Sequence, residues 1–481
     1  MVSSLRQKTS KSIAWVAIDV MGSKILQFAI GIVLARLLLP EEFGILGLIT
    51  VFIAFSMVFI DSGFSFALIR KKEVDNKELN TIFWFNLIIS FFFYVLLWFA
   101  SPFIAKFYNQ PILTLIIKVI SLNLIINAIG SIQQVNLKRN MQFKQLTIAG
   151  VSSKILSGII AIIFALNGFG VWSLVAQQLS MNFFRVCFML FFNRFIPVFV
   201  FSKSAFRNLF SFSSKLLYGS ILNAIVSNIY PLVIGKFYTV GDVGYFNRAK
   251  TLQQLPVNTF TTIIQQVSLP SFSKIQDEDE RFKLAYQKAM KMSVFVIALP
   301  LLILIVAAYP LIEFLITSKW LPAAEMLRIL AIGGVFYPLS ALNVNIIGIK
   351  GRSDLVMYSQ FIKDGLSLSA MFIGMFWGVN GLVWSFAIVG ILSYFINAYY
   401  ANKVIIYTIK SQILDVLPII IIMTLSGIVA YFLMQLVDSN FLKIIVVAAA
   451  SSAIYLTFAI IFKIDSLKET YSMVKLLVNR N

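Results

Sequence analysis

Apolar runs of about twenty residues alternate with short polar links along the whole chain. A helix needs about 20 apolar residues to cross the hydrocarbon core of a membrane. The pattern predicts fourteen such helices, with approximate cores at 13–37, 44–68, 82–101, 112–134, 146–166, 171–192, 209–235, 244–268, 292–316, 323–348, 355–377, 382–402, 413–436 and 441–462. Between the eighth and ninth helices, the charged segment 269–291 predicts a surface helix.

Composition supports an integral membrane protein. Of the 481 residues, 59% are hydrophobic and only 12% are charged, whereas soluble domains are about a quarter charged. The chain has no His and a single Cys, Cys187, which excludes imidazole chemistry and an intrachain disulfide. No phosphate-binding GxxxxGK[ST] segment is present, so we do not expect ATP hydrolysis by this chain. We also expect no cofactor and no metal.

The net charge of +20 is explained by membrane topology without invoking nucleic acid. If the N-terminus is cytoplasmic, 26 of the 40 basic residues fall in the two tails and in the even-numbered links. Only five fall in links on the opposite side: Arg36, Lys106, Lys236, Lys319 and Lys443. Because Lys and Arg collect in cytoplasmic loops, this split predicts that both termini are cytoplasmic.

Two stretches of the chain align without a gap at an offset of 200 residues. ARLLLPEEFGILG (35–47) links the first and second predicted helices, and GKFYTVGDVGYFN (235–247) links the seventh and eighth. Gly44 falls on Gly244, and Glu42 falls on Asp242. Glu41 falls on Gly241, so an acidic pair is not a shared requirement.

A second correspondence follows at an offset of 212, where Lys138 falls on Lys350 and Val171-Trp172-Ser173 falls on Val383-Trp384-Ser385. The two matches predict two six-helix repeats, at 1–200 and 201–410, followed by two additional helices and a cytoplasmic tail at 411–481. Parallel repeats are a transporter architecture, with the substrate site at the interface of the halves.

At these motifs the chain resembles a known family. ARLLLPEEFG, DSGFSFALIRK (61–71), QQVNLKRNMQF (133–143) and GYFNRAKTLQQLP (244–256) are similar to the polysaccharide transporter family of the multidrug/oligosaccharidyl-lipid/polysaccharide exporter superfamily. Within it the likeness is to O-antigen flippases and to colanic-acid and teichuronic-acid exporters, over nearly the whole chain.

The resemblance implies two six-helix bundles that form a V around a central cavity in the bacterial cytoplasmic membrane. It also implies a substrate, an oligosaccharide on an undecaprenyl-pyrophosphate carrier, which moves from the inner to the outer leaflet by alternating access. Membrane lipids and polysaccharide polymerase or assembly proteins are the implied partners. The last two helices are expected to contribute to a groove for the lipid tail.

Nine basic residues fall within predicted helices. Lys118 and Arg328 lie near outer ends, where they can snorkel to the headgroups. The other seven are Lys24, Lys154, Arg185, Lys215, Arg248, Lys250 and Lys363. A basic residue at a helix centre costs about 2.5–3.5 kcal/mol on insertion scales, so we expect these residues to line a protein-enclosed cavity that binds a pyrophosphate and acidic sugars. Structural ion pairs and snorkelling are the alternative. At the offset of 212, Lys154 and Lys363 fall three positions apart, which predicts cations on similar faces of equivalent helices.

The candidates for carboxylates deep within predicted helices are Asp19, Asp61 and Asp364. They are candidates for ion coupling or for structural roles. For Asp61 we favour a structural role, because it begins the sequence DSGF near the inner end of the second predicted helix. A multidrug or cation antiporter of the same superfamily is the alternative function, but cationic drugs require carboxylates where this chain offers more cations. A membrane polysaccharide polymerase or glycosyltransferase is disfavoured because no predicted outer loop is large enough for a catalytic domain.

Overall fold

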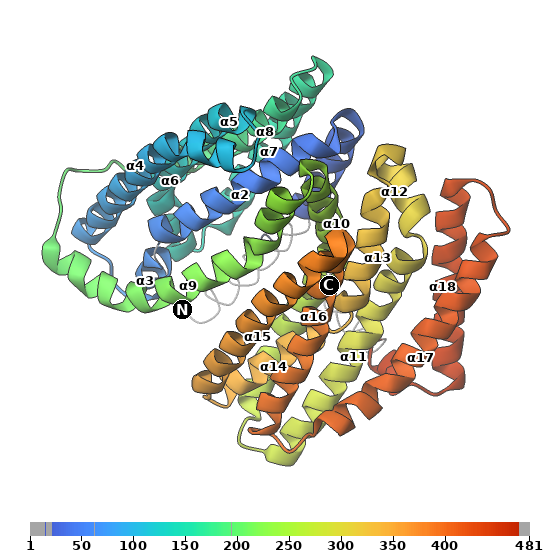
Figure 1. Cartoon of the computed structure of the whole chain (residues 1–481). Helices are drawn as coiled ribbons and strands as arrows, with labels where there is room; N and C mark the ends of the chain where they lie inside the picture. Colours follow the sequence, from blue (N-terminus) through green and yellow to red (C-terminus); the bar gives the residue numbers. More distant parts are fainter. Residues whose placement is uncertain (1–14, 16–21, 62, 194, 471–481) are drawn as a thin grey trace. The chain divides into compact units, whose positions relative to one another are not determined.

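The computed structural model describes residue 15 and residues 22–61, 63–193 and 195–470 (Figure 1). Within these residues the chain forms helices and connecting turns without strands, which confirms the expected all-α membrane class. Contacts divide the chain into two compact units, Met1–Gly244 and Tyr245–Asn481. This boundary falls later than residue 200, where the repeat predicts one, and the division into six-helix repeats stays a prediction.

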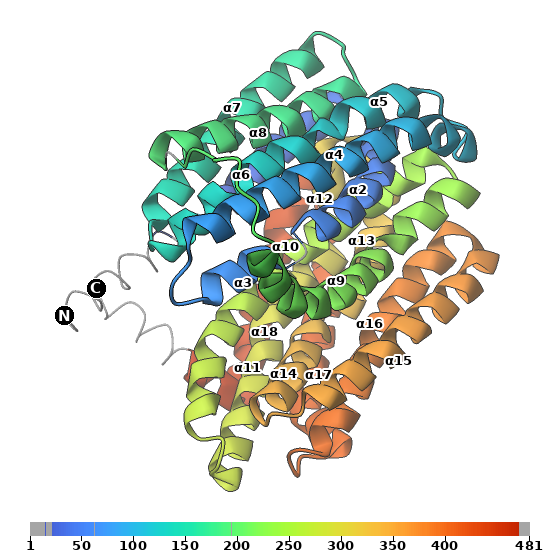
Figure 2. The ribbon, with the colours of Figure 1, turned by 90° about the vertical axis from the view of Figure 1, so that its left-hand side faces the viewer.

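Among its described residues, the first unit contains a helix over 22–37 and eight further helices, and it ends in the first turn of α10 (Val240–Lys274). The eight helices are α2 (Pro40–Asp61), α3 (Phe64–Arg70), α4 (Asn76–Phe107), α5 (Ile112–Ile120), α6 (Leu122–Arg139), α7 (Phe143–Leu166), α8 (Val171–Phe192) and α9 (Lys203–Phe237). α7 and α8 form an antiparallel pair, and α6 packs against both α4 and α8 (Figure 2). A core around Phe64, Phe83 and Ile132 joins α3, α4 and α6.

The second unit contains most of α10 and the remaining helices. These are α11 (Asp279–Val306), α12 (Ala308–Ile316), η1 (Ser318–Trp320), α13 (Pro322–Gly334), α14 (Tyr337–Ile349), α15 (Ser353–Gly374), η2 (Met375–Trp377), α16 (Gly378–Asn402), α17 (Ile409–Met434) and α18 (Asn440–Ile461). α17 packs along α11, and the Tyr455 hydroxyl of α18 donates to the Phe295 carbonyl of α11 at 3.0 Å. The two C-terminal helices are therefore fastened to α11.

Eleven segments of the described chain are long and apolar enough to cross a membrane, and one of them, Ser353–Asn402, contains both α15 and α16. The predicted helix at 13–37 lies partly outside the described residues. α10 is not among the eleven because polar residues interrupt its apolar runs. The chain is a multi-pass membrane protein, and the count of fourteen stays a prediction.

The segment 269–291 was predicted as a surface helix, and that prediction is wrong. α10 continues to Lys274 and α11 begins at Asp279, so the charged residues extend two long helices at their ends. Four residues suffice for the turn between them. Charge alone could not distinguish a separate helix from the polar ends of two spanning helices.

The repeated corner is built from the same hydrogen bonds in both places. Before α2, the Leu39 amide donates to the Glu42 carboxylate at 2.7 Å. Before α10, the Thr239 amide donates to the Asp242 carboxylate at 3.0 Å, and the Thr239 hydroxyl accepts from the Asp242 amide. An acid at the third helical position that satisfies the N-cap amide is half of a capping box. This role explains why Glu42 and Asp242 share a position.

The two corners also touch each other within the first unit, and their glycines make the contact possible. A Cβ on Gly44 would lie 1.8 Å from the carbonyl oxygen of Val240. A Cβ on Gly244 would lie 2.0 Å from the carbonyl oxygen of Pro40. Each corner therefore uses its glycine to accept the backbone of the other corner, and the contact is reciprocal.

The second correspondence requires a different offset from the one that the sequence suggests. The Gln142 amide donates to the Leu137 carbonyl, and the Arg352 amide donates to the Ile347 carbonyl, which is a shift of 210 residues. The helices that follow begin at Phe143 and Ser353, with the same shift. A residue of positive φ fixes the frame of each turn, Met141 at 52° and Gly351 at 75°. In this loop the shift is therefore 210 residues, and the alignment of Lys138 with Lys350 is wrong.

Candidate functional site

Three of the predicted cations lie at a similar level of three packed helices in the first unit. The Thr147 hydroxyl of α7 donates to the Trp15 carbonyl at 3.1 Å, and a Cβ on Gly158 would meet the Ile30 side chain. The two segments therefore run in parallel, with Lys24 and Lys154 between these contacts. Both side chains are half-buried.

Arg185 joins this level from α8. Val186 and Met189 share a packed cluster with Ala149, and Leu174 shares another with Ala161. This antiparallel register places Arg185 within about one helical turn of the level of Lys154. The packing thus brings Lys24, Lys154 and Arg185, which are far apart in sequence, to one depth of the unit.

Two further predicted cations pack against aromatic rings in the second unit. The Arg248 guanidinium carbon lies 5.8 Å from the centre of the Trp320 ring, and Trp320 is fully buried. The Lys250 ammonium lies 5.1 Å from the centre of the Phe386 ring. Cation–π contacts of this kind contribute about 2 kcal/mol or more when they are desolvated. Arg248 and Lys250 therefore stabilise the packing of α10 against η1 and α16.

The remaining predicted site residues are not brought into one cluster by the described contacts. Lys215 belongs to α9, but its side chain lies outside what the structure describes, as does the whole of Asp19. Lys363 is half-buried on α15, and its neighbour Asp364 accepts a 2.7 Å hydrogen bond from the Gln360 amide.

The shift of 210 also changes how the predicted charges of the two halves compare. Lys154 lies eleven residues after the first residue of α7, and Asp364 lies eleven residues after the first residue of α15. Lys363 corresponds to Ser153, and residues one position apart point about 100° away from each other on a helix. The expectation that Lys154 and Lys363 occupy similar faces is therefore wrong.

Asp61 ends α2 at a sharp turn and lines a pocket in the first unit. Gly63 has a φ of 76°, and the Ser65 hydroxyl of α3 donates to the Asp61 carboxylate at 2.6 Å. This bond joins the two helices and agrees with a structural role for Asp61. The pocket has a volume of about 700 Å³ and lies between α2, α3, α4, α6 and α9.

The walls of this pocket present amides and hydroxyls rather than many charges. Asn86 is 1% exposed, and its Nδ2 donates to the Ser131 hydroxyl at 3.3 Å, while its Oδ1 has no partner among the described residues. Asn127, Gln134 and Lys138 also line the pocket. Groups of this kind hydrogen-bond hydroxyl-rich ligands, and the exposed Lys138 adds one cation at the cytoplasmic end expected from the charge distribution.

Sequence reasoning missed these polar residues because it followed charge alone. A readable signal was present, since the pocket-lining residues Asn127, Ser131, Gln134 and Lys138 are spaced by four, three and four positions. That spacing places them on one face of a helix, and α6 carries them into the pocket. A polar stripe on an otherwise apolar helix indicates a face turned away from lipid.

A comparison with protein families identifies the family of this chain. Residues 33–325, more than half of the chain, match the model described as "polysaccharide biosynthesis protein". The chain belongs to this family. This confirms the family membership expected from the sequence motifs.

Relatives of the polysaccharide biosynthesis protein family cover most of the chain. It is 26% identical to the teichuronic acid biosynthesis protein TuaB of Bacillus subtilis (strain 168), over 89% of both chains. It is also 26% identical to the lipopolysaccharide biosynthesis protein WzxC of Escherichia coli (strain K12), over 82% of this chain and 81% of the relative. Both alignments therefore cover more than four fifths of each chain.

Solved structures show the same fold. The lipid II flippase MurJ in an inward closed conformation aligns with 95% of this chain and 100% of its own, at a TM-score of 0.77 and 18% identity. A multidrug resistance transporter of the MATE family, in an inward-facing conformation, aligns with 82% of this chain and 97% of its own, at a TM-score of 0.64 and 16% identity. At these identities the likeness concerns the fold.

Proposed function

We propose that this protein is a flippase that moves a lipid-linked oligosaccharide from the inner to the outer leaflet of the bacterial cytoplasmic membrane for surface polysaccharide synthesis. The observation that carries the proposal is membership of the polysaccharide biosynthesis family in a chain made of membrane-spanning helices. A spanning protein can serve polysaccharide synthesis without being an enzyme by moving an intermediate across the bilayer. The carrier is an undecaprenyl pyrophosphate, and both termini are cytoplasmic.

The first unit supports this proposal with two kinds of recognition chemistry. The amide-lined pocket beside Asn86 suits the hydroxyls of an oligosaccharide. The cations at the level of Lys24, Lys154 and Arg185 suit the pyrophosphate, because charge-assisted bonds to phosphate oxygens are stronger than neutral ones. We assign sugar contacts to the pocket and pyrophosphate contacts to the cations. Lys363, on α15 of the second unit, stays a predicted substrate contact.

Deletion of the gene tests the proposed function. We expect lipid-linked oligosaccharide to accumulate on the cytoplasmic leaflet, with loss of surface polymer. Unchanged polymer together with altered drug tolerance would instead establish a multidrug antiporter. Export of single repeat units that are not joined into polymer would point to a polymerase.

Lys154→Met tests the assignment of the pyrophosphate. The variant retains a long apolar side chain but loses the charge, so we expect slower export at unchanged membrane abundance. Lys274→Met is the matched control, since Lys274 is exposed at the end of α10. Equal export by the two variants would remove Lys154 from the substrate path.

A further inference from the structure

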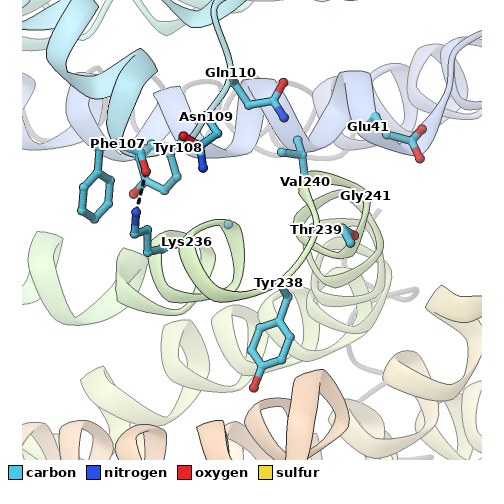
Figure 3. Close-up of a pocket in the computed structure, with 11 residues that line it drawn as sticks. Glu41, Phe107, Tyr108, Asn109, Gln110, Lys236, Tyr238, Thr239, Val240 and Gly241 are labelled. Atoms are coloured by element: carbon cyan, nitrogen blue, oxygen red, sulfur yellow. Dashed lines mark hydrogen bonds between the residues drawn. The ribbon is translucent and has the colours of Figure 1, made fainter.

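The first unit holds a second pocket at the opposite end of its helices from Asp61. Its volume is about 520 Å³, within the range of about 300–1,000 Å³ that is usual for small-ligand sites. It lies where α4 ends, where α9 ends, and where the two corners begin α2 and α10 (Figure 3). All of its residues belong to the first unit. Under the proposed orientation this end faces the outside.

Several polar groups around this pocket have no partner among the residues that the structure describes. The side chains of Glu41, Asn109 and Gln110 make no hydrogen bond or ion pair within the described part of the chain. The Lys236 ammonium donates to the Phe107 carbonyl at 2.7 Å and has two further N–H groups. Figure 3 shows Lys236 and Asn109 on neighbouring walls.

The pocket also contains a tyrosine that stays protonated. Tyr108 is 7% exposed, and burial raises its pKa to about 12. The hydroxyl can therefore donate as well as accept at any physiological pH.

The corner glycines shape this pocket as well. A Cβ on Gly241 would lie 3.1 Å from a Glu41 carboxylate oxygen, so the absence of a side chain at Gly241 makes room for Glu41. This explains the one acidic position at which the two corners differ. The first corner carries the carboxylate, and the second corner provides the space that it occupies.

The charges select among ligand classes. One carboxylate and one ammonium line the pocket, so their formal charges cancel, which disfavours a phosphate headgroup. A single carboxylate beside an ammonium is also a poor cation site. Amides, a phenol and one charge of each sign match the alternating donors and acceptors of sugar hydroxyls.

We propose that this outer pocket binds an uncharged sugar of the transported oligosaccharide as it leaves the protein, with Glu41, Asn109 and Gln110 as contacts. The proposal rests on the proposed function for the source of the sugar. It adds to that function an exit-side saccharide site distinct from the pocket beside Asn86. Because the site lies within one unit, its occupancy does not require the two units to assume a particular arrangement.

Saturation-transfer NMR on the purified full-length protein in detergent tests the site, with methyl glucoside and methyl N-acetylglucosaminide as probes. We expect saturation transfer to at least one glycoside from the wild type. Asn109→Ala with Gln110→Ala removes hydrogen bonds from two residues and should weaken that binding about tenfold or more. Asn167→Ala with Gln435→Ala is the matched control, since both are exposed amides in links predicted to face outside. Equal saturation transfer in the two double variants, or no transfer to either glycoside in any of the proteins, would overturn the site.

Two further measurements separate the site from its alternatives. Displacement of the glycoside by an equal concentration of inorganic phosphate would overturn the saccharide assignment in favour of a headgroup site. Translocation of lipid-linked oligosaccharide is measured separately in reconstituted vesicles. Glycoside binding that depends on Asn109 and Gln110, in a protein that fails to translocate, contradicts the proposed function and leaves the saccharide site standing. Translocation without such binding contradicts the site alone.

Discussion

Replacing the two corner glycines by alanine tests how the corners are held together. In Gly244→Ala, the new methyl carbon would lie 2.0 Å from the Pro40 carbonyl oxygen, and in Gly44→Ala it would lie 1.8 Å from that of Val240. Ordinary contacts begin near 3.4 Å. The starts of α2 and α10 must therefore move apart by about 1.4 Å in Gly244→Ala and about 1.6 Å in Gly44→Ala, because no rotamer change can displace a backbone oxygen.

The expected loss of stability follows from two opposing terms. Overpacking of this kind costs about 1–3 kcal/mol. Alanine is favoured over glycine within a helix by about 1 kcal/mol, which offsets part of the cost. The difference of the two terms is a loss of about 0–2 kcal/mol, and we expect the upper half of this range because each clash is with backbone. With the first unit, Met1–Gly244, as the unfolding unit, Tm in detergent, followed by tryptophan fluorescence, should fall by about 2–8 °C.

Gly219→Ala and Gly365→Ala are matched controls. Both residues lie in helices, α9 and α15, and a Cβ on either would meet no heavy atom of the described chain within 4 Å. Helix propensity alone predicts an unchanged or raised Tm for them. If Gly44→Ala and Gly244→Ala melted at the same temperature as these controls, the reciprocal contact would have no energetic significance.

Three further predictions concern the pocket, the aromatic contacts and the response to pH. Asn86→Leu removes a buried amide whose oxygen has no partner among the described residues, so we expect slower export at an unchanged or higher Tm. A lower Tm with normal export would contradict a binding role for Asn86. Lys250→Met retains the side-chain stem beside Phe386 but loses the cation–π contact, and should lower the free energy of unfolding by about 1–2 kcal/mol, measured against wild type by thermal melting. Burial and the hydrogen bond to Asp415 raise the pKa of Tyr407, so this residue contributes stability that is complete below the usual tyrosine pKa of about 10 and is lost above it. Tyr407→Phe should therefore show a shallower fall of Tm between neutral pH and pH values above 10 than wild type does, and an identical slope would refute this assignment.

The two polar pockets could not be predicted from the sequence, because each is formed by the directions in which side chains of several helices point. The four-three-four spacing on α6 could be read from the sequence as a stripe, but its partners on α4 and α9 could not. Asn86 lies in a long apolar run and carries no signal of its own. Only the packing of α4 against α6 gives its amide a neighbour in Ser131.

The depth of the cations in the predicted membrane is likewise predicted in part by the sequence and decided in part by helix packing. Counting apolar residues places Lys24, Lys154 and Arg185 inside predicted spans, which alone predicts that they avoid lipid. Their common level follows from the register of three helices, fixed by contacts such as that between Ile30 and Gly158. Arg248 and Lys250 carried the same sequence signal, yet they pack on Trp320 and Phe386.

The sequence by itself determined the helical membrane class, because a chain in hydrocarbon must satisfy its backbone hydrogen bonds within each helix. It also determined the family and the position of the repeated corner, both of which are local patterns. Only the tertiary structure decided that the backbones of the two corners contact each other, that Gly241 makes room for Glu41, and which polar residues share a pocket. Those outcomes depend on the distances between helices that are remote in sequence, and no local pattern contains them.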